Sequence, residues 1–67
     1  MEVHVTGFVV AIVVLRSAKH NVSSGTAPII YVDTEEEQQK VSMYMSRIFK
    51  AAVHDLENGV FILVKQY

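Results

Sequence analysis

The sequence predicts a small α+β domain in which three strands form a mixed sheet and one helix covers one of its faces. Segments 2–15 and 60–64 are rich in β-branched residues, which favour strands. Between residues 41 and 56, apolar residues recur at spacings of three and four, which is the periodicity of an amphipathic helix. The chain has 67 residues, a length that allows a single domain, 1–67.

The first predicted strand lies within residues 2–15 and contains the most apolar stretch of the chain, residues 8–15. This stretch is much shorter than the roughly 20 apolar residues of a membrane-spanning helix. The residues before it include Glu2 but no Lys or Arg, which does not fit a secretory signal. We therefore expect a cytoplasmic protein that does not enter a membrane.

A polar segment, residues 16–26, separates the first strand from the second. Its Ser, Asn and Gly residues are typical of a loop. The second strand is expected at residues 29–32, directly after Pro28, because the start of a strand tolerates a missing N–H group.

The helix is predicted at residues 35–57. Thr34 and Glu37 have the spacing of a capping box, in which two side chains satisfy N–H groups at the start of a helix. Asn58 and Gly59 follow the predicted helix, and Gly commonly ends helices in the left-handed conformation. The residues expected on the buried face are Val41, Met45, Ile48, Ala52 and Leu56.

These elements give the order β-β-α-β. A strand–helix–strand crossover makes its two strands parallel, so the second and last strands are expected to be parallel. The first strand is the most apolar, and we expect it between them, antiparallel to both.

The predicted strands are apolar on both faces. A strand with one face in water alternates apolar and polar residues, whereas residues 8–15, 29–32 and 60–64 do not. One helix covers only one face, and large exposed apolar patches are unusual on soluble monomers. We therefore expect a second copy of the chain to cover the other face in a closed homo-oligomer. The residues expected at this interface are Phe8, Val10, Ile12, Val14, Ile30, Phe61 and Leu63.

Basic residues recur on the outer face of the predicted helix and in the 16–26 loop, which suggests a second function. Phosphate groups bind such residues, so the chain is alternatively a nucleic-acid or anionic-ligand binder. The competing interpretations are a solvated helix face and a flexible connector, and the net charge of −1 does not favour a nucleic-acid binder. The candidate anion-binding residues are Arg16, Lys19, His20, Ser23, Ser24, Lys40, Arg47, Lys50 and His54.

An enzyme is the third hypothesis. Asp33 follows the second strand, and functional residues are common at the carboxyl ends of strands in α/β sheets. The chain has no Cys, and His4, His20 and His54 lack the spacing of metal ligands within one element. We therefore expect no cofactor and no metal site. A catalytic site would have to form between subunits, so a non-enzymatic homo-oligomeric assembly module ranks first.

Overall fold

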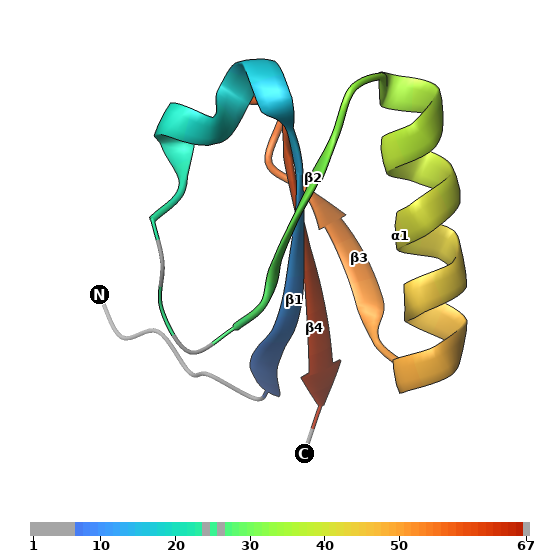
Figure 1. The fold of residues 1–67 in the computed structure, drawn as a ribbon. Helices are drawn as coiled ribbons and strands as arrows, with labels where there is room; N and C mark the ends of the chain where they lie inside the picture. Colours follow the sequence, from blue (N-terminus) through green and yellow to red (C-terminus); the bar gives the residue numbers. More distant parts are fainter. Residues whose placement is uncertain (1–6, 24, 26, 67) are drawn as a thin grey trace.

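The computed structural model describes residues 7–23, 25 and 27–66. Within these residues, one α-helix packs on a four-stranded mixed sheet, and a short 3-10 helix, η1, lies beside the other face (Figure 1). The elements are β1 (Gly7–Leu15), η1 (Arg16–Asn21), β2 (Ile29–Val32), α1 (Glu35–Phe49), β3 (Ala52–Asp55) and β4 (Val60–Gln66).

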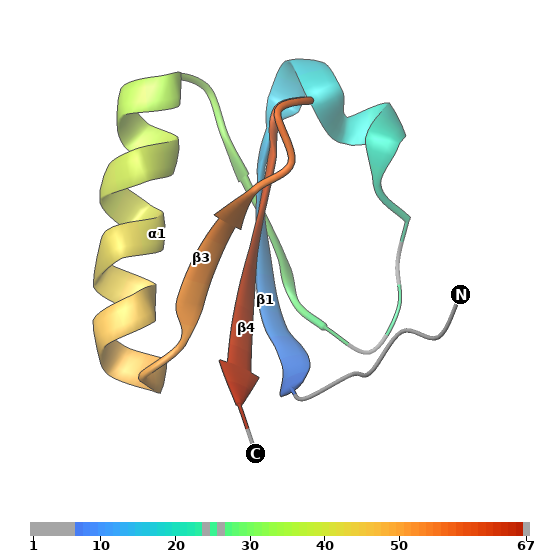
Figure 2. The ribbon, with the colours of Figure 1, turned by 180° about the vertical axis from the view of Figure 1, so that it is seen from behind.

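The strand order is β2-β1-β4-β3, so β1 lies inside the sheet as predicted (Figure 2). β1 is parallel to β2 and antiparallel to β4. The prediction that β1 is antiparallel to both neighbours is therefore wrong. The cause is β3, which the sequence analysis did not predict. The crossover from β2 through α1 leads to β3, and the hairpin that follows reverses the chain into β4.

The predicted start of the helix is confirmed, but its predicted end at residue 57 is wrong. The Thr34 hydroxyl accepts a hydrogen bond from the Glu37 N–H over 3.1 Å. α1 ends at Phe49, because Lys50 adopts the left-handed conformation, with φ 54° and ψ 47°. Residues 52–55 then pair with β4 instead of continuing the helix.

The main core lies between α1 and the sheet. Its fully or almost fully buried members are Ala11, Val13, Val32 and Leu63. From α1, Val41 and Met45 pack against this core as expected. Ile48 does not, since 74% of its surface is exposed. Gln38 and Ser42 are buried instead, so the buried face of α1 is centred nearer its N-terminal half than the sequence predicted.

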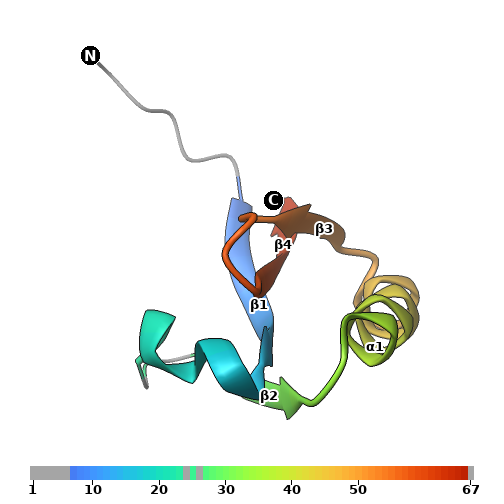
Figure 3. The same ribbon diagram turned by 90° about the horizontal axis from the view of Figure 1, so that it is seen from above.

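A smaller core lies on the opposite face, where η1 covers one end of the sheet (Figure 3). Ala18 of η1 packs with Val14 and Val60, and all three are buried. The chain therefore covers part of this second face with its own residues, which the sequence analysis did not foresee.

An irregularity in β1 changes which residues face α1. The pairing of β1 with β4 shifts register between Val9 and Ala11, so Val10 is an extra residue of the kind that forms a β-bulge. Val10 packs against the core under α1. Val9 pairs with Val64, on the second face of the sheet.

Candidate functional site

Within the described part of the chain, an apolar surface stays open on the second face of the sheet, beyond the part that η1 covers. We call it the open face and define it by Val9, Ile12, Ile62 and Val64. Val9 pairs with Val64 and Ile12 with Ile62 across the β1–β4 ladder. Such directly opposed residues are neighbours on one face. Val9 is 40% exposed and the other three are half-buried.

The predicted interface residues are divided between the two faces. Ile12 and Val14 lie on the second face, where Val14 is already fully buried beside Ala18. The others face α1: four belong to the main core or pack on it, and Phe8 pairs with Lys65 in the corresponding register. The prediction placed all of these residues on one face. They are divided because β1 contains a bulge and because both faces of β2 and β4 are similarly apolar. The residues on the α1 side are Phe8, Val10, Ile30, Phe61 and Leu63.

A second open feature is the groove between α1 and β3. Its volume is about 400 Å³, and Met43, Val53 and Phe61 supply apolar lining. Ser42 also lines the groove, and its buried hydroxyl has no hydrogen-bond partner among the described residues. At the end of the groove near the start of α1, an adjoining hollow is lined by the acidic residues Glu35, Asp55 and Glu57.

The outer edge of β3 is free of strand partners in the described chain, because β3 is the last strand of the sheet (Figure 2). The Leu56 N–H donates to the Val60 carbonyl over 3.0 Å. Bonded and non-bonded pairs alternate along an antiparallel ladder, so His54 and Ile62 form a bonded pair. The N–H and C=O groups of Val53 and Asp55 therefore point away from β4.

The candidate anion-binding residues do not form one site. Lys40 and Arg47 lie on α1, whereas Lys19 and His20 lie on η1 at the other face of the sheet (Figure 3). Lys50 is the C-cap of α1. His54 lies in β3 and not on the helix stripe. Ser23 is exposed, and Ser24 lies outside the described residues.

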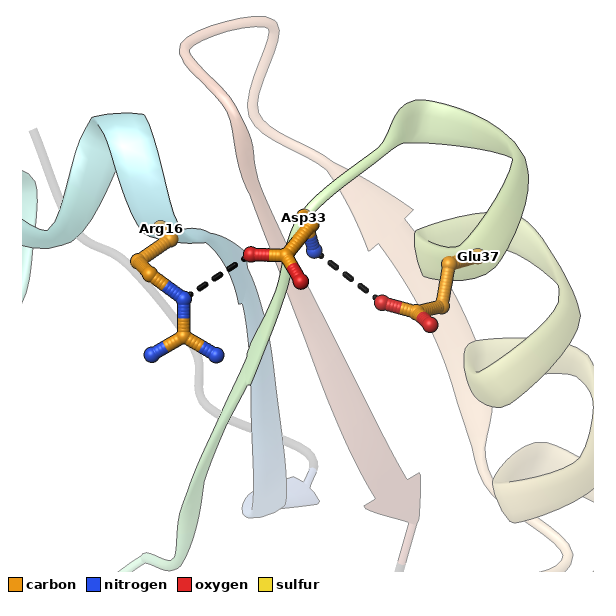
Figure 4. Close-up of polar contacts among 3 residues, drawn as sticks. All are labelled: Arg16, Asp33 and Glu37. Atoms are coloured by element: carbon orange, nitrogen blue, oxygen red, sulfur yellow. Dashed lines mark hydrogen bonds and ion pairs between the residues drawn. The ribbon is translucent and has the colours of Figure 1, made fainter.

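Arg16 and Asp33 form an ion pair that sequence reasoning did not predict. The Arg16 Nε donates to the Asp33 Oδ1 over 2.9 Å, and both side chains are more than half exposed (Figure 4). Arg16 also lies over the Tyr31 ring, 6.0 Å from its centroid. The Asp33 N–H donates to Glu37 over 3.0 Å. These contacts give Asp33 a structural role at the start of α1.

The described residues contain no group of three or more His, Asp or Glu side chains arranged to hold a metal ion. His4 lies outside the described residues. Within the same part of the chain, no helix has the length and apolar character needed to cross a membrane.

Gln38 is the buried polar contact that sequence reasoning missed. Its side chain is 1% exposed, and its Nε2 donates to the carbonyls of Val13 and Gly59, each over 2.9 Å. It thus ties α1 to β1 and to the turn before β4. Gln38 is followed by Gln39, and nothing in the local sequence indicates which of the two is buried.

Comparisons with known proteins indicate the class of protein to which the chain belongs. Neither the search of curated proteins nor the search of solved structures found a match. A family model described as "Capping complex subunit for YIEGIA" matches residues 6–66, which is nearly the whole chain. A subunit of a complex is an assembly or interaction module by definition. The chain belongs to the family of capping complex subunits for YIEGIA.

Proposed function

We propose that this chain is a non-enzymatic assembly subunit that associates with a second copy of itself through the open face and joins a complex with YIEGIA. The observation that carries the proposal is the open face itself. It lies on β1 and β4, the two inner strands of the sheet, and its defining residues are all aliphatic. The family description supports the role of a complex subunit and names YIEGIA.

Self-association removes this surface from water. Two sheets can pack face to face about 10 Å apart with their apolar side chains interdigitating. Burial of apolar area stabilises such a contact by about 25 cal/mol per Å² before the costs of association are subtracted. A domain of this size buries only about 60% of its unfolded surface on its own, so it has more to gain from association than a larger one.

Val64→Asp tests the open face, because it places a charge among the four aliphatic residues. We expect the variant to stay folded, since Val64 is only half-buried. In sedimentation velocity, its assemblies should contain fewer copies than those of the unmodified chain. Ile48→Asp is the matched control: it also replaces an aliphatic residue with Asp, but on α1, where Ile48 is 74% exposed. It should leave the assembly unchanged.

Circular dichroism of both variants separates lost association from lost folding. The proposed role of the open face is wrong if folded Val64→Asp associates like the unmodified chain, or if Ile48→Asp is the variant that dissociates.

A further inference from the structure

We propose that two copies of this chain also pair edge to edge through β3, antiparallel about a two-fold axis at His54, so that their sheets join into one. This inference deepens the proposed function by naming a second self-contact at a different surface. It rests on three properties of residues 50–57: the direction of the backbone groups, the order of the charges and the lack of protection at the edge.

The backbone groups of β3 are self-complementary. The outward N–H and C=O groups belong to Val53 and Asp55, as the ladder with β4 requires. In an antiparallel pair centred on His54, Val53 of one copy lies opposite Asp55 of the other. The outward N–H and C=O groups of Val53 and Asp55 then point at each other, so each Val53–Asp55 pair is hydrogen-bonded. The two His54 residues lie opposite each other between these pairs and are not hydrogen-bonded to each other.

The charges around β3 favour the antiparallel arrangement. Lys50 stands just before the strand, and Asp55 and Glu57 stand at its end and just beyond it. An antiparallel pair brings the basic end of each strand toward the acidic end of the other. A parallel pair would place like charges together, which destabilises neighbouring strands. A second copy in the antiparallel orientation therefore complements the charges along this edge.

The edge lacks three features that commonly prevent such pairing, although β3 is short and contains Asp55. Edge strands are commonly protected by Pro, by Lys or by a covering segment. Residues 52–55 contain neither Pro nor Lys, and all four are exposed. The opposite edge strand, β2, directly follows Pro28. A strand added to β3 would lie along the open side of the α1–β3 groove, where Met43 and Val53 are 42% and 37% exposed.

Opposite charges at position 54 test the two-fold axis, because that residue faces its own copy. We would prepare His54→Glu and His54→Lys, each also carrying Val64→Asp to remove the proposed open-face contact, and label one of them with ¹⁵N. Like charges directly opposite each other weaken a strand pair, so each variant alone should dimerise about fivefold more weakly than the Val64→Asp chain. In a mixture, native mass spectrometry should show mixed dimers well above the half expected from random pairing.

Dimers in random proportions, or no dimers in the mixture, would overturn the proposal. Neither result depends on the open face. If the open-face contact does not exist, Val64→Asp does not change association, and the mixing experiment still reports on the β3 edge. Conversely, a failure of Val64→Asp to change association leaves the mixing experiment valid.

Val53→Pro gives a second, independent test. The Val53 N–H points away from β4, so its removal spares the intramolecular ladder, and Pro is tolerated at such outward positions of edge strands. In the Val64→Asp background, we expect this change to weaken dimerisation at least tenfold. Val53→Thr is the control, since it keeps the N–H and the β-branched shape and should dimerise normally. Equal dimerisation of Val53→Pro and Val53→Thr would contradict edge pairing.

Discussion

Val13→Asp should leave the chain unfolded. Val13 is fully buried in the main core, and among the described residues no charged side chain is buried there to compensate a carboxylate. Burying an unpaired charge costs several kcal/mol. The total stability of a domain of this length is about 3–10 kcal/mol. The far-ultraviolet circular dichroism spectrum should therefore lose its helix and strand signal.

Val13→Thr is the control for this prediction, because Thr has nearly the shape of Val but adds a hydroxyl. We expect it to fold with a free energy of unfolding lowered by about 1–3 kcal/mol. A Val13→Asp chain with native secondary structure and a cooperative thermal transition would show that the main core has been assigned to the wrong residues.

Gly59→Ala should lower the free energy of unfolding by about 3 kcal/mol. Gly59 has a φ of +84°, and a Cβ atom at this position would lie 2.6 Å from the Cβ of Ala18. The substitution therefore adds backbone strain and overpacks the contact between η1 and the turn before β4. For a domain of 60–100 residues, this change corresponds to a melting temperature lower by at least about 12 °C.

Two further variants separate the two causes. Gly25→Ala should shift the free energy of unfolding by less than about 0.5 kcal/mol, because no heavy atom lies within 4 Å of the added Cβ. Ala18→Gly removes the clashing atom, so Gly59→Ala should be less damaging in that background. All of these chains must be compared at one concentration, since association contributes to apparent stability. Equal effects of Gly59→Ala with and without Ala18→Gly would mean that steric overlap contributes nothing.

Local signals explain which elements the sequence predicted correctly. The apolar, β-branched stretch of β1, the position of Pro28 before β2 and the Thr34 cap each depend on neighbouring residues alone. The end of α1 does not. Lys50 adopts a left-handed conformation that Gly usually adopts at helix ends, so the sequence carries no stop signal there. Ala52 and Leu56 continued the helical periodicity by coincidence.

The turn at Asn58-Gly59 was assigned to the wrong element. This dipeptide is typical both of a helix end and of a hairpin between strands. It lies in the β3–β4 hairpin, where Asn21 of η1 also donates to the Asn58 carbonyl over 3.0 Å. Asn58-Gly59 forms a hairpin turn because residues 52–55 pair with β4. A local sequence pattern does not show such a non-local contact.

A second apolar face of the sheet was predicted, but the residues that form it were not. Two-sided apolarity correctly indicated that more than one face of the sheet is apolar. It could not indicate which alternate set faces α1, because both sets are apolar in β2 and β4. The bulge at Val10 then exchanged the faces of β1 residues on its two sides. Ion pairing of Arg16 with Asp33 likewise depends on β1 and β2 ending side by side.

Native mass spectrometry of the unmodified chain at micromolar concentration tests most directly the claim that this protein is a self-associating subunit. Two self-contacts at different surfaces, the open face and the β3 edge, predict an assembly larger than a dimer, with four copies as its smallest closed form. Weakening of either contact, by Val64→Asp or by Val53→Pro, should shift the mass toward that of two copies. A monomer of the unmodified chain at 7.5 kDa would contradict the account.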